Sequence, residues 1–467
     1  MTAPEELPVV KNGRARKWRR VLGVLGGMGL IVLGAGWWFY GRDEAPPDDA
    51  DMQISIPRVP DEENGMVQLG RLHRNAMDFY AYATAHGVSD EDAGNITEGL
   101  SRNDALMDAF LASATPELQK VGALLALPIF EDSGKRSFMT EHPEYENLIR
   151  LGSVLRLQAQ RRAEAGDYAG ATDDVLRLRH LTQRFGEGYL PARGLLMAFD
   201  INSMANQGCA ELLNDRGLPA GELARLVQAW SMETSWAQIY SRGMMMECLY
   251  ASNSMGVMRA RDFYGFHVPD SNFHKSTWND FLGAWLNFTL QPNTTRRLLA
   301  EVCRPAKRSL DGTYTQRPQL PYMHEPSPLE SDLWLAKPNG AGRGLVAQVA
   351  LSLDPFVCFG FGAVAADRLT RVGLALRQYY NVHHELPPTL AALVPQYLAT
   401  VPTDPFDGQP LRYDPGRHLV YAVGTDLNDH HGSKFLGLTP STDDYMEPLY
   451  DSAQPTLELK FAQKPVK

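Results

Sequence analysis

Residues 145–185 read YENLIRLGSVLRLQAQRRAEAGDYAGATDDVLRLRHLTQRF and determine the fold class. Apolar residues recur here three and four positions apart, which predicts two helices with one apolar face each. Between the two stripes, Gly166 suits a left-handed helix end and Asp167 suits the cap of the next helix. The stretch therefore predicts a helical hairpin. Its stripes are Leu148, Leu151, Leu155 and Ala159, then Val175, Leu178 and Leu181.

The same periodicity extends over residues 65–304 and predicts an α-helical bundle domain. The expected helices after the hairpin are Leu195–Leu213, Leu223–Trp230, Trp236–Tyr250 and Arg296–Val302. The turn AEAGDYAGA, with Gly166, Tyr168 and Ala171 on the pattern, resembles the inter-helix turn of a tetratricopeptide repeat. No second copy lies 34 residues away, and a repeat array needs about three units. A lone hairpin is therefore expected.

Composition and charge limit the class of protein and its partners. The chain has 467 residues, of which 44% are hydrophobic and 21% charged, so it has the composition of a globular protein with two or three domains. Its net charge is −10, although residues 1–20 carry six basic residues and two acidic ones. An acidic body repels phosphate backbones, so nucleic acid is not an expected partner.

The N-terminal part predicts a membrane anchor. Residues 21–40, VLGVLGGMGLIVLGAGWWFY, carry no charge and are long enough to cross the hydrocarbon core of a bilayer. A basic cluster precedes them and acidic residues follow, which predicts a cytoplasmic N-terminus by the positive-inside rule. We expect a single-pass inner-membrane protein of a bacterium with a periplasmic body. A cleaved signal peptide is the alternative, although the apolar run is longer than usual for one.

Three less regular regions complete the organisation. Residues 41–64 are rich in proline and acidic residues and predict a tether. Residues 305–340 form a proline-rich connection, either an interdomain strap or a binding loop draped on the helices. The apolar run 344–366 is interrupted by Pro355 and predicts a buried helix pair, with a second membrane segment as the alternative.

The last third of the chain changes character at residues 341–440. Leu369–Tyr380 predicts a helix, and the turn signals Asp404-Pro405 and Asp407-Gly408 precede two expected strands, Leu411–Tyr413 and Leu419–Val423. A helix packed on an antiparallel hairpin is therefore expected. Residues 441–467 are assigned to a C-terminal tail.

Residues 369–432 of this module resemble the globular region of the type II secretion major pseudopilins. In that family a Tyr, His and Pro cluster ends a helix, a short TLxxLVPxYL helix follows, and a DPFDGxPLRY turn precedes a YxVGxDG strand. The matching residues here are Tyr379, His383, Pro387, Thr389, Leu390, Leu393, Val394, residues 402–413, Val420, Tyr421, Val423, Gly424 and Asp426. The resemblance implies an α+β module and invites a role in secretion machinery.

The family often holds calcium in the loop after this last strand. Here the loop is GTDLNDHHGS, in which Asp426, Asn428 and Asp429 supply oxygen donors for a possible calcium site. The alternative is a loop whose acids cap its own backbone. Zinc is not expected at His430 and His431, because adjacent side chains diverge and no third ligand is near.

No residues are singled out as catalytic or cofactor-binding. The sequence lacks GxSxG, GxxxxGK and HExxH motifs, and His384-Glu385 is followed by prolines that end a helix. The four cysteines form no CxxC pair. Outside the cytoplasm one disulfide is possible, and Cys209 with Cys248 is the expected pair, with buried free thiols as the alternative.

The sequence therefore predicts a mainly α protein, with an N-terminal transmembrane helix, a helical body and a small α+β module. The expected function is that of a non-enzymatic scaffold or interaction protein of the envelope. A component of type II secretion or pilus-like machinery is one alternative. A periplasmic hydrolase is another, which a pocket holding two carboxylates roughly 5 to 9.5 Å apart would favour.

Overall fold

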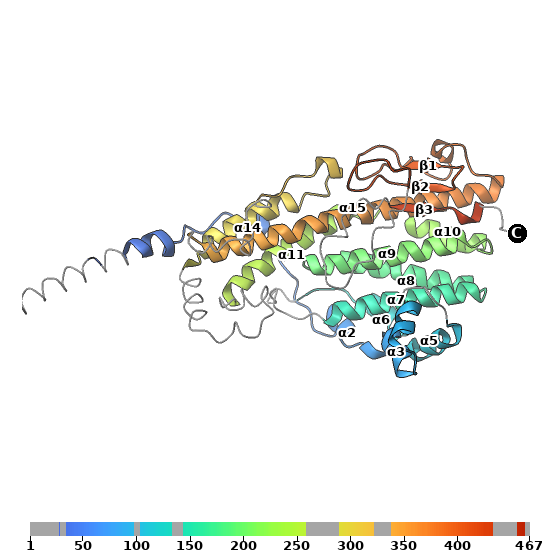
Figure 1. Cartoon of the computed structure of the whole chain (residues 1–467), viewed down its shortest axis with the longest axis horizontal. Coiled ribbons are helices and arrows are strands. Elements are labelled where there is room, and N and C mark those ends of the chain that lie inside the picture. Colours follow the sequence, from blue (N-terminus) through green and yellow to red (C-terminus); the bar gives the residue numbers. More distant parts are fainter. Residues whose placement is uncertain are drawn as a thin grey trace, which may run out of the picture. The chain divides into compact units, whose positions relative to one another are not determined.

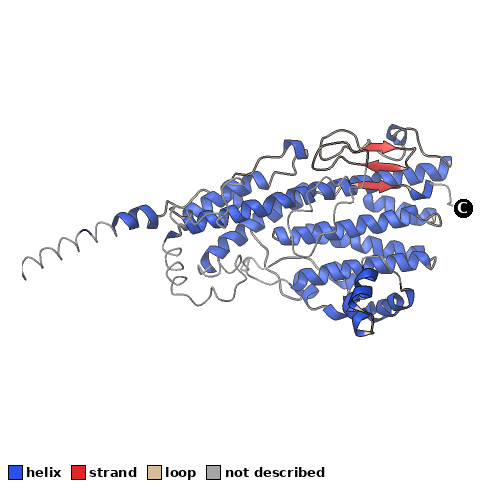
Figure 2. Ribbon diagram, viewed as in Figure 1, coloured by secondary structure: helices blue, strands red, loops and turns tan. Residues whose placement is uncertain are grey.

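The computed structural model describes residues 28, 34–97, 103–132, 143–257, 289–321, 338–432 and 455–462 (Figure 1). The chain is mainly helical with a small three-stranded antiparallel sheet (Figure 2), which confirms the coarse fold class. It divides into two compact units along lines that differ from the domains expected from the sequence. The first is Met1–Asp48, Val257–Leu298 and Glu325–Gln348, and the second is Asp49–Gly256, Leu299–His324 and Val349–Lys467.

In the first unit, Asp43 holds the start of α14 (Pro292–Ala306). Its carboxylate accepts hydrogen bonds from the backbone N–H groups of Asn293, at 2.7 Å, and Thr294, at 3.0 Å, which would otherwise lack helical partners. The π-helix η1 (Trp37–Gly41) precedes Asp43. Among the described residues, no helix is both long and apolar enough to cross a membrane. Most of the expected anchor, residues 21–27 and 29–33, lies outside that part of the chain.

Short helices precede the main bundle in the second unit. They are η2 (Ala50–Met52), α2 (Gly65–Gly70), η3 (Arg74–Met77), α3 (Phe79–Ala85), α4 (Asp90–Thr97), α5 (Asp104–Leu118) and α6 (Val121–Leu125). The bundle consists of α7 (Pro143–Glu164), α8 (Tyr168–Gly186), α9 (Ala192–Asn214), α10 (Ala220–Trp230), α11 (Trp236–Val257) and α15 (Gly340–His383). Further short elements are η5 (Tyr314–Gln316), η7 (Leu390–Leu393) and η9 (Lys460–Ala462).

The helical hairpin that the sequence predicts is confirmed in α7 and α8. Gly166 has a φ of +80° and ends α7 in the left-handed conformation. The Asp167 carboxylate accepts a 2.9 Å hydrogen bond from the Gly170 N–H and caps α8. Both predicted stripes are buried: Leu148, Leu151, Leu155, Ala159, Val175, Leu178 and Leu181.

Helices α7, α8 and α9 pack against one another, and each of the three contacts both of the others (Figure 1). The helices approach closely where α7 carries Gly152, because a Cβ atom there would lie 2.4 Å from Ile201 of α9. A side chain at position 152 would therefore collide with the Ile201 and Met204 side chains unless they shifted. The part of α15 that belongs to the second unit lies against α9, where Asn206 donates to Asp367, and the strands lie beyond α15 (Figure 1).

Helix α15 corrects the expectation of a helix pair at 344–366. It is one helix of 44 residues that passes through Pro355. Proline removes one backbone hydrogen bond, but an apolar face packed on neighbours keeps such a helix intact. Leu353, Val357 and Phe361 are buried on either side of this proline.

The sheet has the order β1 (Arg412–Asp414), β2 (Leu419–Tyr421) and β3 (Thr456–Glu458). The β1 and β2 hairpin was predicted and is confirmed, with Tyr413 opposite Val420. The assignment of all residues 441–467 to a tail is wrong for 456–458, because β3 pairs with β2 and places Leu457 opposite Val420. Residues 441–454 and 463–467 of that assignment lie outside the described chain.

The described part of the proline-rich connection, residues 305–321, packs on the module. The backbone N–H groups of Tyr314 and Thr315 donate to the carbonyls of Pro405 and Phe406, at 3.0 and 3.2 Å. The Tyr314 ring lies edge-on to Phe361 of α15, with ring centroids 5.5 Å apart. This segment therefore acts as a strap against the turn that follows η7.

Candidate functional site

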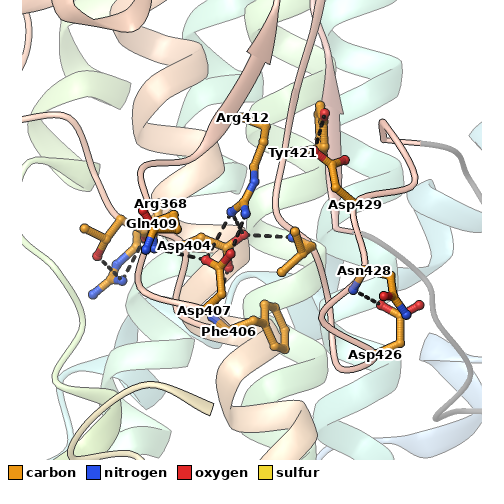
Figure 3. Close-up of polar contacts among 12 residues, drawn as sticks. Arg368, Asp404, Phe406, Asp407, Gln409, Arg412, Tyr421, Asp426, Asn428 and Asp429 are labelled. Carbon is orange, nitrogen blue, oxygen red and sulfur yellow. Dashed lines mark hydrogen bonds and ion pairs between the residues drawn. The ribbon is translucent and has the colours of Figure 1, made fainter. Parts of the chain in front are cut away.

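The turn at Asp404 is the centre of the polar contacts in the C-terminal module (Figure 3). One carboxylate oxygen of Asp404 accepts from the Phe406 N–H at 2.9 Å, and the other accepts from the Val423 N–H at 2.8 Å and the Arg412 guanidinium at 2.7 Å. Asp404 is completely buried, and desolvation raises the pKa of its carboxyl. Asp404 thus joins the turn to both halves of the hairpin.

Arg412 completes this turn by bonding a second carboxylate, that of Asp407. The hydrogen bond from Arg412 lowers the pKa of Asp407, so the carboxylate stays charged. Arg368 of α15 reaches the same turn from the bundle and donates to the Thr403 carbonyl at 2.9 Å (Figure 3). Arg412 pairs with Asp404 and Asp407, Arg368 pairs with Glu233, and these contacts together hold the turn in place.

The predicted calcium residues follow β2, and the structure brings Asp426 and Asn428 together but not Asp429 (Figure 3). Asp426 accepts from the Asn428 N–H at 3.1 Å and contacts His430 at 2.7 Å. Asp429 accepts from the His431 N–H at 2.8 Å and lies toward Tyr421, away from Asp426 and Asn428 (Figure 3). Calcium takes six to eight converging oxygens, so this arrangement does not fit the ion.

The contacts match the alternative in which the acids of the loop cap its own backbone. In the part of the chain that the structure describes, no three His, Cys, Asp or Glu residues form a cluster that could hold a metal. Calcium binding at Asp426, Asn428 and Asp429 stays a prediction, and it would require the loop to rearrange. Calorimetry with calcium on the wild type and on Asp426→Ala tests it.

The aromatic cluster that carries the resemblance does assemble. The rings of Tyr379 and His383 lie tilted against each other with centroids 4.1 Å apart, and the Tyr413 hydroxyl donates to the Pro387 carbonyl at 3.0 Å. Burial raises the pKa of Tyr413 well above its ordinary value, so its hydroxyl stays protonated. The cluster fixes the end of α15 against β1.

A buried ionic network joins α15 to the bundle, and the sequence analysis missed it. Asp367 of α15, 1% exposed, accepts two 3.0 Å contacts from Arg179 of α8. It also accepts from Asn206 at 2.9 Å, Thr234 at 2.9 Å and Trp236 at 3.1 Å. These residues are far apart in the sequence. The only signal of the network that the sequence offered was the charged residue Asp367 within the apolar stretch of α15.

The cysteines pair differently from the expectation. The disulfide joins Cys248 of α11 to Cys303 of α14, whose Cα atoms are 6.6 Å apart. The expected pair of Cys209 with Cys248 is wrong. Cys209 is a free thiol in the core of the bundle, where burial raises its pKa. The two cysteines of the real pair are separated by 55 residues and lie on helices that do not follow one another directly, so helix order gave no sign that they meet.

A groove between α7, α9 and β3, with a volume of about 580 Å³, gathers four acidic residues: Glu164, Glu211, Asp215 and Glu458. All four are engaged by neighbouring groups, and Glu458 pairs with Lys460 at 3.8 Å. Glu164 pairs with Arg161 and Glu211 with Arg156, each at 2.7 Å, and Asp215 accepts from the Tyr168 hydroxyl at 3.0 Å. This pairing gives no support to the acid and base roles that the hydrolase alternative needs.

Comparisons with known proteins identify no relative. No protein-family model, curated protein or solved structure matches the chain.

Proposed function

We propose that this protein is a membrane-anchored, extracytoplasmic scaffold or interaction protein of the bacterial envelope. The observation that carries the proposal is the disulfide between Cys248 and Cys303. Disulfides form and persist outside the reducing cytoplasm. The apolar run 21–40 and the basic residues before it supply the means of export and anchoring.

Internal pairing of charges supports a structural role for the body. Asp367, Asp404 and Arg412 all lie in clusters that join separate helices or strands. A scaffold needs such rigid joints, because its partners bind to a surface of fixed shape.

Thiol chemistry and protease access test the proposal together. In bacterial cells expressing the full chain, alkylation before reduction should leave Cys248 and Cys303 unmodified. A variant that lacks residues 1–42 stays in the cytoplasm, and both thiols should then react after denaturation. Protease should digest the body in spheroplasts and leave it intact in inverted membrane vesicles. Digestion in sealed inverted vesicles would overturn the proposed topology.

The second candidate is a component of type II secretion or pilus-like machinery. The order of η7, the Asp404 turn and the β1–β2 hairpin along the chain supports this candidate, because the resemblance predicts a short helix, a turn and a hairpin in that order. Copurification with a secretion ATPase or an inner-membrane platform would support this role. Its absence under conditions that retain known platform contacts would leave the general scaffold as the function.

A further inference from the structure

A second groove, with a volume of about 390 Å³, lies between α10, α15 and residues 397–403. We call it the Arg371 groove. Its charged lining residues are Arg368, Arg371 and Glu233, and its apolar lining includes Val227, Leu374 and Val401. A volume of this size is typical of small-ligand sites, and the wall of this groove combines polar and apolar surface in similar amounts.

Arg371 is held at one end and open at the other. Its Nε donates to the Trp230 carbonyl at 3.0 Å, which fixes the guanidinium plane. Among the described residues this is its only hydrogen bond, and no carboxylate pairs with it. The two terminal nitrogens therefore keep the fork of donors that binds a carboxylate in bidentate fashion.

Arg368, one turn before Arg371, is already neutralised. Its Nε donates to Glu233 at 2.7 Å and its Nη1 to the Thr403 carbonyl at 2.9 Å. The two guanidinium groups and one carboxylate leave the groove with a single net positive charge. That charge matches a monoanion better than a doubly charged phosphate, since each unbalanced charge is costly to desolvate.

Tyr397 supplies a further polar group. Its hydroxyl is buried and has no hydrogen-bond partner, and the residue lines the groove. A buried hydroxyl without a partner is unfavourable, and because this one is closed off from the groove, a ligand oxygen would bond it and relieve that penalty only after the residues around it shift. The side chain is held by Tyr379, whose ring lies edge-on at 5.8 Å.

We propose that the Arg371 groove binds a monocarboxylate with an aliphatic body, with the carboxylate on Arg371 and Tyr397 and the body against Leu374 and Val401. Two sources share this chemistry, namely a free small carboxylate and the C-terminus of a peptide that ends in an apolar residue. The groove is separate from the Asp404 turn and from the calcium loop.

The test titrates the full chain in nanodiscs with four probes, followed by ligand-observed NMR. The probes are N-acetyl-leucine, its amide, the peptide acetyl-Ala-Ala-Leu with a free C-terminus, and inorganic phosphate. We expect at least one of the two carboxylates to bind, and the amide and phosphate to bind at least about 10-fold more weakly. Binding of acetyl-leucine alone indicates a free small carboxylate, and binding of the peptide alone or better indicates a C-terminus.

Variants locate the site. Arg371→Gln should weaken carboxylate binding roughly 10- to 100-fold, and Arg371→Lys should retain part of it, because a lysine keeps the charge without the fork. Tyr397→Phe should weaken binding about 3- to 10-fold without lowering the melting temperature, since the lost hydroxyl has no protein partner. If Arg371→Gln fails to fold, the Tyr397→Phe result decides.

Arg193→Gln is the matched control, because Arg193 is exposed on the first turn of α9 and does not line the groove. It removes the same charge and should leave binding unchanged. Four results would overturn the proposal: no binding of either carboxylate at about 10 mM, equal binding of the amide, tighter binding of phosphate, or equal losses in Arg193→Gln and Arg371→Gln.

Discussion

Glu247 gives the sharpest test of the fold, because it is a buried carboxyl without a cationic partner. It lies on α11, is 6% exposed, and accepts one hydrogen bond, 2.9 Å long, from the Ala192 N–H at the start of α9. Desolvation raises its pKa from 4.5 to about 7. Each pKa unit corresponds to about 1.4 kcal/mol, so the charged form destabilises the folded state by roughly 3 kcal/mol.

The sign of the pH dependence follows from the direction of the shift. The folded protein binds this proton more tightly than the unfolded chain does, so the free energy of unfolding falls as pH rises from 4.5 toward about 7, and stays lower above it. Glu247→Gln keeps an oxygen for the Ala192 N–H but cannot ionise. We expect it to be about 2 to 3 kcal/mol more stable than the wild type at pH 8.5. Near pH 4 the two should be equal.

Urea unfolding of the full chain, followed by circular dichroism at pH values between 4 and 8.5, measures this difference. Glu211→Gln is the control, because Glu211 is a half-exposed partner of Arg156 on the surface of α9. Its effect should stay within about 1 kcal/mol at every pH. A difference between Glu247→Gln and the wild type that did not change with pH would refute the reasoning.

Three further perturbations test other joints. Cys303→Ser should lower the free energy of unfolding by about 2 to 5 kcal/mol under oxidising conditions. Reductant should abolish this difference between the variant and the wild type. Thermal melts of the two proteins with and without reductant measure the difference under each condition. Asp367→Ala leaves Arg179 without its carboxylate partner in the core and should lower the free energy of unfolding, measured with urea, by about 3 to 5 kcal/mol. A decrease of less than about 1 kcal/mol would contradict the pairing. Gly373→Ala places a Cβ atom 2.3 Å from Leu457, so amide hydrogen exchange in residues 456–458 should become faster than in the wild type. Gly362→Ala on the same helix adds its Cβ atom in open space and should leave this exchange unchanged.

The sequence predicted what depends on neighbours along the chain. The stripes of α7 and α8, the cap at Asp167 and the β1–β2 hairpin follow from local periodicity and turn chemistry. Even β3 had a local signal, because TLELKF alternates polar and apolar residues, and Leu457, Leu459 and Phe461 are buried. The prediction of a tail gave more weight to the position near the terminus than to this alternation.

What the sequence could not predict depends on contacts between distant segments. Asp367 meets Arg179 from 188 residues away, and Cys303 meets Cys248 across 55 residues. No periodicity encodes such meetings. The calcium prediction identified plausible oxygen donors, but the backbone of the loop decides where they point, and it turns Asp429 away from Asp426.

The pairing of β3 with β2 has a consequence for how the sheet is completed. Leu419 pairs with Glu458, so the edge of β2 that faces away from β1 stays open until residues 456–458 have been made and have docked. The β1–β2 hairpin forms from neighbouring residues, whereas its third strand arrives from a later segment of the chain. Cleavage before residue 456 would therefore leave that edge of β2 without its partner strand.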